Sequence, residues 1–289
     1  MISLWNKNIE QQFFNESINF VTSEQLFYLT NNNKYLAYWP KNYKGRKNTL
    51  QSRNSLIGKY TEKWCTDLIQ NIIKGQGLFA VQGAICEDLS LTKASPADVI
   101  ISKSKDIYQK PEDILVIFEV KMSIVWNWER MADGTLVCIG DYKTHQGNPS
   151  LLRSDSMLKA IGKSINIRIS NSDAFNIPIV ILGNTPITNN YFKKVDNLKA
   201  TGIIQGFWSL NPNPLDDDKK SIKNTNNKGF LRIDTIEELK KLVTSVLLEE
   251  RSFFSGMKSN KELGKIIELA NKGTTYEKKA ELFLKLIKE

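Results

Sequence analysis

Two short apolar runs decide the fold: Ser95-Pro96-Ala97-Asp98-Val99-Ile100-Ile101 and Ile114-Leu115-Val116-Ile117-Phe118-Glu119-Val120-Lys121. Runs of this length that are rich in Val and Ile are typical of strands buried on both faces of a sheet. In the second run, Leu115, Ile117, Glu119 and Lys121 share one face, and Val116, Phe118 and Val120 share the other. An apolar strand that ends in Glu and Lys breaks its own pattern, which indicates a functional site or a strand leaving the core.

The two runs are expected to pair with each other. Residues 102–113 are polar, contain Pro111 and predict a loop. In an antiparallel pair, Asp98 then lies opposite Phe118 or, with a shift of one residue, opposite Glu119. Cross-strand neighbours have Cβ atoms about 5 Å apart, so Asp98 and Glu119 should lie side by side, with Lys121 next to them. Two carboxylates this close repel each other unless a cation lies between them, and hard oxygen ligands suit Mg²⁺.

This pattern resembles the PD-(D/E)XK nuclease superfamily, the fold of many type II restriction endonucleases. Pro96 and Asp98 match the first half of the motif, with Ala97 between them as a departure from the strictest form, and Glu119-Val120-Lys121 match the second half. The resemblance covers residues 53–210. It implies an α/β (α+β) fold with a restriction-endonuclease-like core, in which a mixed central β-sheet is flanked by helices.

The same resemblance implies the roles of the site residues. Asp98, Glu119 and the backbone carbonyl of Val120 would hold Mg²⁺. Lys121 would orient the attacking water or stabilise the charge that develops on the phosphate. In several relatives a helix before the first strand supplies a further acid, for which Glu62 is the candidate, although a solvated surface glutamate is the alternative.

Glu-x-Lys alone is a weak signal, because it also occurs at Glu238-Leu239-Lys240 and at Glu277-Lys278-Lys279. Both of those lie in amphipathic helical stretches, where such pairs are ordinary solvated charges. Only Glu119 ends an apolar strand that has an aspartate on its predicted partner. The structural alternative is that Glu119 and Lys121 merely face water and that Asp98 is a turn residue.

The charge of the chain favours a polyanionic partner. Its 289 residues include 40 Lys and Arg against 31 Asp and Glu, a net charge of +9. The three cysteines, Cys65, Cys86 and Cys138, are too few and too irregular for a disulfide framework or a zinc motif, which indicates a reducing cytoplasm. We expect no signal peptide and no membrane span, because no apolar stretch approaches about 20 residues.

A single histidine, His145, excludes nuclease sites that need paired histidines within one chain. It lies in a predicted loop and is expected at the surface or facing DNA. Further candidate DNA contacts lie in two other segments. They are Lys41, Lys44, Arg46 and Lys47 among the aromatics of residues 34–47, and Trp126, Trp128 and Arg130 in a predicted hairpin with Asp133-Gly134 at its turn. In the first segment, the alternative is that the aromatic residues pack on the core while the lysines are solvated; in the second, it is that the residues pack on the N-terminal segment.

The predicted organisation has three parts. Residues 1–52 are an appendage with possible DNA contacts, residues 53–210 are the nuclease core with the hairpin 122–140 inserted, and residues 211–289 contain a polar loop, a short strand and C-terminal helices. The core is expected to run helix, three strands, helix, strand, helix, strand. The C-terminal helices could serve as a dimer surface, a recognition subdomain or simple packing.

The predicted function is a Mg²⁺-dependent, site-specific endonuclease of double-stranded DNA, a type II restriction enzyme that acts as a homodimer in the cytoplasm. The alternatives are a DNA repair or junction-resolving nuclease and a non-catalytic DNA-binding protein on the same fold. A carboxylate enzyme for small phosphorylated substrates lacks support, because the chain has no Gly-rich phosphate loop.

Overall fold

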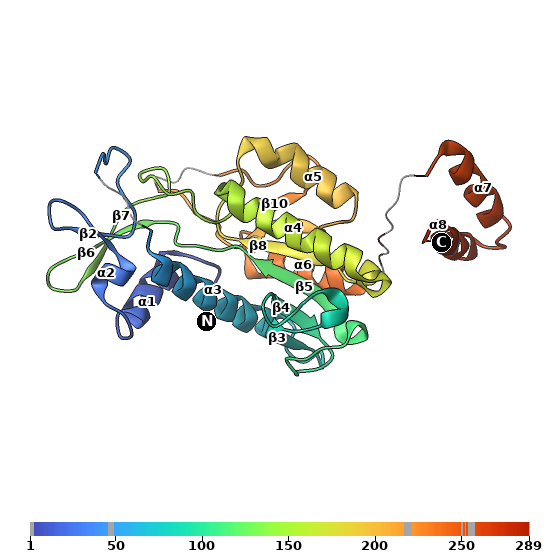
Figure 1. Cartoon of the computed structure of the whole chain (residues 1–289), viewed down its shortest axis with the longest axis horizontal. Helices are drawn as coiled ribbons and strands as arrows, with labels where there is room; N and C mark the ends of the chain where they lie inside the picture. The colour runs from blue at the N-terminus through green and yellow to red at the C-terminus, as the bar shows by residue number, and fades with distance from the viewer. Residues whose placement is uncertain are drawn as a thin grey trace.

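The computed structural model describes residues 3–45, 49–216, 221–249, 251, 253 and 258–288. Its centre is a mixed sheet of six strands in the order β10-β9-β8-β5-β4-β3 (Figure 1). Three strands form an antiparallel half: β3 (Phe79–Ala84), β4 (Ala97–Ser102) and β5 (Ile114–Val120). Three more extend it in parallel with β5: β8 (Ile179–Gly183), β9 (Gly206–Ser209) and β10 (Phe230–Arg232).

Helices cover both faces of this sheet because its strands are apolar on both sides. Val116 and Phe118 pack in one core with residues of α3 (Gln51–Ile72) and α6 (Ile236–Leu248). Ile117 packs in a second core with residues of α4 (Ser154–Ser170) and α5 (Phe192–Ala200). The predicted fold class, a mixed central sheet flanked by helices, is therefore confirmed, and so is the alternation of side chains along the second apolar run.

The predicted order of the core elements is also confirmed. After β5, α4 leads to β8 and α5 leads to β9, as the alternation of helical and apolar segments indicated. A short 3₁₀ turn precedes each of α4 and α5. The 3₁₀ segments of the described chain are Glu87–Leu89, Pro111–Asp113, Ser150–Leu152, Ser172–Asn176 and Asn189–Tyr191.

A second, smaller sheet joins the N-terminal region to the inserted hairpin. Its order is β1 (Tyr28–Leu29), β2 (Tyr35–Leu36), β6 (Asn127–Arg130) and β7 (Leu136–Gly140). β6 and β7 pair antiparallel across a turn in which Gly134 has a φ of 88°, as the Asp-Gly signal predicted. The pairing of β2 with β6 was not predicted, because two-residue strands leave no periodic pattern.

The first residues are more than an appendage. α1 (Lys7–Ser17) contributes Phe13 and Phe14 to the same core as α3 and β5, and Trp5 is fully buried there. α2 (Ser23–Leu26) has Thr22 as its N-cap, which forms a capping box with Gln25. The boundary predicted at residue 52 therefore does not separate two hydrophobic cores.

The C-terminal helices, α7 (Asn260–Ala270) and α8 (Tyr276–Lys288), pack chiefly on each other and are drawn apart from the sheet (Figure 1). Of the polar segment 211–229, residues 217–220 lie outside the described chain. Its end is fixed by the carboxylate of Asp196, which accepts hydrogen bonds from Thr225 Oγ1 and from the amides of Asn227 and Gly229. None of the helices in the described part of the chain combines the length and apolar character of a membrane span.

Candidate active site

The strand register brings the two predicted acids together. Val99 lies opposite Phe118 in the antiparallel pair β4–β5, so the next residues outward, Asp98 and Glu119, face each other at the strand ends. This is the register shifted by one residue that the sequence left open. Asp98 and Glu119 alternate with Val99 and Phe118, so both side chains lie on the face of the sheet that α4 covers.

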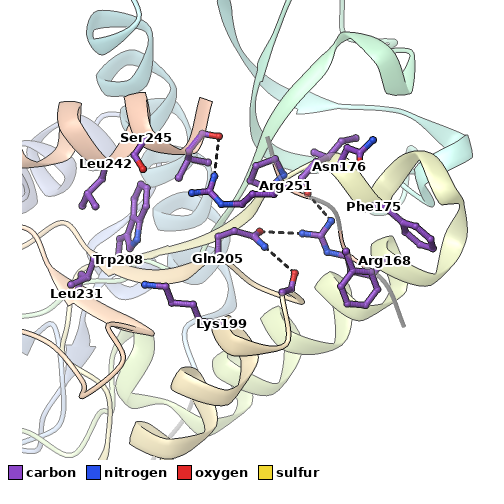
Figure 2. A pocket seen from close by; sticks show the side chains of 15 residues that line it. Arg168, Phe175, Asn176, Lys199, Gln205, Trp208, Leu231, Leu242, Ser245 and Arg251 are labelled. Carbon is purple, nitrogen blue, oxygen red and sulfur yellow. Dashed lines mark hydrogen bonds between the residues drawn. The ribbon is translucent and has the colours of Figure 1, made fainter. Parts of the chain in front are cut away.

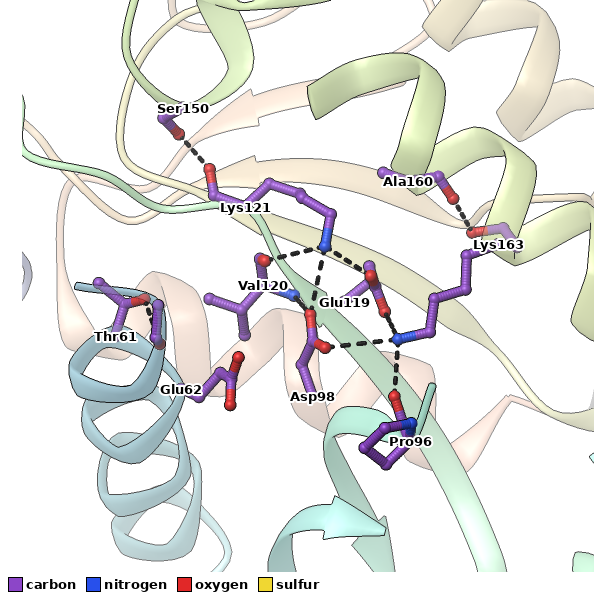
Figure 3. A network of polar contacts seen from close by, with 12 residues as sticks. Thr61, Glu62, Pro96, Asp98, Glu119, Val120, Lys121, Ser150, Ala160 and Lys163 are labelled. Atoms are coloured by element: carbon purple, nitrogen blue, oxygen red, sulfur yellow. Dashed lines mark hydrogen bonds and ion pairs between the residues drawn. The ribbon is translucent and has the colours of Figure 1, made fainter. Parts of the chain in front are cut away.

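Lys121 lies where three oxygen atoms converge (Figure 3). Its Nζ is 2.5 Å from Glu119 Oε1, 3.1 Å from the carbonyl oxygen of Val120 and 3.4 Å from Asp98 Oδ2. The backbone amide of Val120 donates a 2.7 Å hydrogen bond to the same Asp98 oxygen, which fixes the orientation of that carboxylate. The structure thus places the three predicted catalytic residues, and the predicted carbonyl, within one cluster.

A second lysine, which the sequence did not single out as a site residue, completes this cluster. Lys163 of α4 places its Nζ 2.7 Å from Glu119 Oε2, 3.4 Å from Asp98 Oδ1 and 2.7 Å from the carbonyl oxygen of Pro96 (Figure 3). In the sequence, Lys163 is one more lysine among the polar residues of an amphipathic segment. A prediction of which face of the sheet α4 covers would have identified Lys163. The helix comes after β5 in the chain and covers the face on which Glu119 lies.

The four side chains are largely withdrawn from water, with between 5% and 19% of each exposed. Burial raises the pKa of Glu119, and the neighbouring Asp98 carboxylate raises it further, while Lys121 and Lys163 oppose this rise. Burial disfavours the charged form of Lys121, but Glu119 and Asp98 outweigh that effect and raise its pKa. Two carboxylates and two ammonium groups therefore balance one another in a low-dielectric site.

Glu62, the candidate for a further acid, lies on α3 at the margin of the same cavity. It accepts a 3.3 Å hydrogen bond from Gln82 Nε2, and burial, followed by the charge of Asp98, raises its pKa. The described residues contain no cluster of three or more His, Cys, Asp or Glu side chains arranged to hold a metal ion. Glu62 is thus near Asp98 and Glu119 without forming a three-acid centre with them.

The donor set nevertheless fits Mg²⁺. The Lys121 ammonium shows that one cation can be close to oxygens of Asp98, Glu119 and Val120 at once. All three are hard oxygen donors, and Mg²⁺ is commonly held by one or two carboxylates while it keeps several waters. The cavity at the site has a volume of about 460 Å³, which leaves room for those waters and for a phosphate group.

Hydrogen bonds from neighbouring segments hold the end of β5 in place. The amide of Lys121 donates to Leu182 O of β8 at 2.7 Å, and Ser150 Oγ donates to Lys121 O at 2.6 Å. Asn184 is fully buried and bonds both the amide and the carbonyl of Ser123 through its side chain. The segment that carries Lys121 is therefore anchored although it lies beyond the last residue of the strand.

The candidate DNA contacts of the inserted hairpin and its neighbourhood need correction. Trp126 and Trp128 are only 1% and 3% exposed, and they pack in the main core with the N-terminal region, which was the alternative given for them. His145, expected in an exposed loop, is buried and stacks on Tyr38 at 4.0 Å between ring centroids. The burial of these three rings in the protein leaves none of them free to contact DNA directly.

The remaining candidate DNA contacts lie on or near the small sheet. Lys41 and Lys44 are exposed, and Arg130 is half-buried at the end of β6. Arg46 and Lys47 lie outside the described residues. Contact of these side chains with DNA stays a prediction.

A second cavity, of about 360 Å³, lies where β8 and β9 begin (Figure 2). Arg168, Lys199 and Arg251 line it, and no acid does so among the described residues. Arg168 is only 2% exposed, and its guanidinium donates to the carbonyls of Ala174, Ile177 and Ile203. These hydrogen bonds join α4 to the segments that precede β8 and β9. They give Arg168 a structural role in holding these segments together.

Comparisons with protein-family models, curated proteins and solved structures found no match to the chain.

Proposed function

We propose that the chain is a Mg²⁺-dependent endonuclease that hydrolyses phosphodiester bonds of double-stranded DNA, and that it is a type II site-specific enzyme. The observation that carries the proposal is the convergence of oxygens from Asp98, Glu119 and Val120 on one cation position at the end of β5, which the Lys121 ammonium occupies in the structure. The net charge of +9 supports a polyanionic substrate. The motif around Pro96, Asp98, Glu119 and Lys121 supports the reaction type.

The proposed reaction is the hydrolysis of a phosphodiester. The oxygen of a water forms a bond to phosphorus, one P–O ester bond breaks, and the leaving oxygen takes up a proton, so that a phosphomonoester and a hydroxyl group result. Asp98, Glu119 and the carbonyl of Val120 would hold the ion. When bound, Mg²⁺ would polarise the phosphoryl group and lower the pKa of water.

Lys121 contributes a positive charge fixed next to the reacting group. Its ammonium lies 2.5 Å from Glu119, and its backbone is bonded to Leu182 and Ser150. A positive charge this close to the oxygens that would hold the ion can orient the water or stabilise negative charge on the phosphate. Lysine suits the task because it is a compact charge on a flexible stem.

The test is incubation of the purified protein with plasmid and phage DNA, in Mg²⁺ and in EDTA. Discrete, reproducible fragments only in Mg²⁺ are expected. A smear, or a requirement for branched DNA, would favour a non-specific or junction-resolving nuclease. Intact DNA that shifts on a gel without any metal requirement would contradict catalysis and favour a DNA-binding protein.

Two variants connect the cleavage to the site. Asp98→Asn and Lys121→Met should each lower the cleavage rate by on the order of 10²- to 10³-fold, the usual effect of removing a group that stabilises charge in the transition state. Asp67→Asn is the matched control, since Asp67 is an exposed carboxylate that pairs with Lys63 at 2.6 Å outside the cavity. Cleavage at a near wild-type rate by either site variant would overturn the assignment.

A further inference from the structure

Glu119 is neutralised from two sides by lysines of different elements. Lys121, at the end of β5, contacts Oε1 at 2.5 Å, and Lys163, from α4, contacts Oε2 at 2.7 Å. Both oxygens of this nearly buried carboxylate therefore already have a cation. Lys163 also has a fixed neutral partner, the carbonyl oxygen of Pro96 at 2.7 Å.

This arrangement opposes the entry of a metal ion. Two carboxylates and two ammonium groups sum to zero charge, so a divalent ion brought to Glu119 would meet two positive charges within a few ångströms. The repulsion between charges at such distances is strong in a partly buried site. An ion can bind well only if at least one ammonium moves away from Glu119.

Both ammonium groups must respond to the ion, because Lys121 lies among the three oxygens that would hold it and Lys163 lies on the other oxygen of Glu119. The backbone of Lys121 is bonded to β8 and to Ser150, and its ammonium also contacts the Val120 carbonyl of its own strand. Lys163 reaches the site from a helix, and its ammonium can keep the Pro96 contact while it releases Glu119. A partly buried ammonium released from a carboxylate needs another anion, and the anion that the proposed reaction brings is the phosphodiester.

We propose that Lys163 is a phosphate-binding residue that neutralises Glu119 when no DNA is bound and transfers its charge to the phosphodiester when Mg²⁺ enters. This proposal rests on the proposed function. It assigns to Lys163 a coupling of metal binding to DNA binding: the DNA-free protein binds divalent ions weakly, and DNA strengthens that binding.

The first test measures Ca²⁺ binding by calorimetry in the absence of DNA. Lys163→Met and Lys163→Gln remove the charge that competes with the ion, so each should bind Ca²⁺ about tenfold more tightly than the wild-type protein. Lys163→Arg keeps the charge and should bind like the wild type. Lys63→Met is the control, because Lys63 also pairs with a carboxylate at 2.6 Å but lies outside the cavity.

The second test measures cleavage at saturating Mg²⁺. Both neutral variants should cleave about 100-fold more slowly, since a charge that contacts the phosphate is lost, whereas Lys63→Met should cleave like the wild type. Unchanged Ca²⁺ affinity would overturn the claim that Lys163 competes with the ion. Unchanged cleavage would overturn the phosphate contact. Thermal melting identifies a variant that fails to fold. If one neutral variant does so, the Ca²⁺ affinity and cleavage rate of the other neutral variant test the proposal.

The two proposals fail in different ways. If the wild-type protein cleaves no DNA in Mg²⁺, the proposed function fails. The Ca²⁺ titration of DNA-free protein still tests Lys163, because it depends only on the contacts of the site itself.

Discussion

The peptide of Val125 shows how single residues fix the segment that leaves the site. Its amide donates to Glu10 Oε1 at 2.5 Å, and its carbonyl lies 3.2 Å from His145 Nε2. His145 Nδ1 accepts a hydrogen bond from the Gly147 amide at 3.1 Å. The imidazole must therefore carry its hydrogen on Nε2, and a second proton on Nδ1 would face an N–H donor.

Acid should destabilise the protein through this imidazole. Burial lowers the pKa of His145 to about 4, whereas an unfolded histidine has a pKa of about 6.5. Between these values the unfolded chain binds a proton that the folded chain does not, so stability falls as the pH drops. The shift corresponds to about 3 kcal/mol between pH 6.5 and pH 4.

Urea unfolding at several pH values, for the wild type and for His145→Gln, measures this effect as a difference in which other titrating groups cancel. The stability advantage of the wild type over the variant should shrink toward pH 4. Because the chain has one histidine, a single imidazole signal in NMR reports its pKa directly. A pKa near 6.5 in the folded protein would contradict the prediction.

At the scale of elements, one carboxylate joins α1 to the start of the small sheet. Glu10 is fully buried and accepts hydrogen bonds from the amides of Val125 and Trp126 and from the indole nitrogens of Trp5 and Trp128. Burial raises its pKa to about 7, although these four donors favour the ionised form. The four donors match the lone pairs of a carboxylate, which no amide side chain can replace.

Glu10→Gln should therefore lower the free energy of unfolding by about 3 kcal/mol at pH 8, because at least one buried N–H donor loses its acceptor and meets another donor instead. Urea titration followed by tryptophan fluorescence measures the change. Glu16→Gln is the control, since Glu16 lies exposed on the same helix, where its carboxylate accepts a hydrogen bond from the side chain of Gln12. A loss below about 0.5 kcal/mol in Glu10→Gln would show that the four hydrogen bonds add little stability.

The elements that the sequence predicted are those whose pattern depends only on local burial. β4, β5 and β8 are continuous apolar runs because helices cover both faces, and Asp98 and Glu119 could be paired because the loop between their strands fixes the register to within one residue. Lys163 could not be assigned, because its helical period shows an ordinary polar-face lysine and only the tertiary path of α4 places it at Glu119. The predicted exposure of His145 was wrong because a distant segment covers its loop: the ring of Tyr38, more than a hundred residues earlier in the chain, stacks on the imidazole.

At the scale of the whole molecule, the described chain divides into a body built around the six-stranded sheet and the helical pair α7–α8. The N-terminal region belongs to the body, since Trp5, Phe13 and Phe14 lie in its main core. The helical pair buries Ile266, Ala270 and Ile287. Since α7 and α8 pack chiefly on each other, the body does not depend on them to bury its apolar faces.

A chain ending at residue 257 should therefore keep the fold of the body. Its thermal midpoint should lie within about 2 °C of that of the full chain, since a loss of 1 kcal/mol would lower the midpoint of a domain of this size by roughly 2–4 °C. A fall of more than about 5 °C would show that α7 and α8 pack on the body in solution.

Light scattering of both chains separates the two roles considered for this pair. Loss of a dimer on truncation indicates a dimer surface, whereas an unchanged oligomeric state with altered cleavage specificity indicates a recognition subdomain. Because Asp98, Glu119, Lys121 and Lys163 all lie in the body, Mg²⁺-dependent cleavage should survive the truncation in the second case.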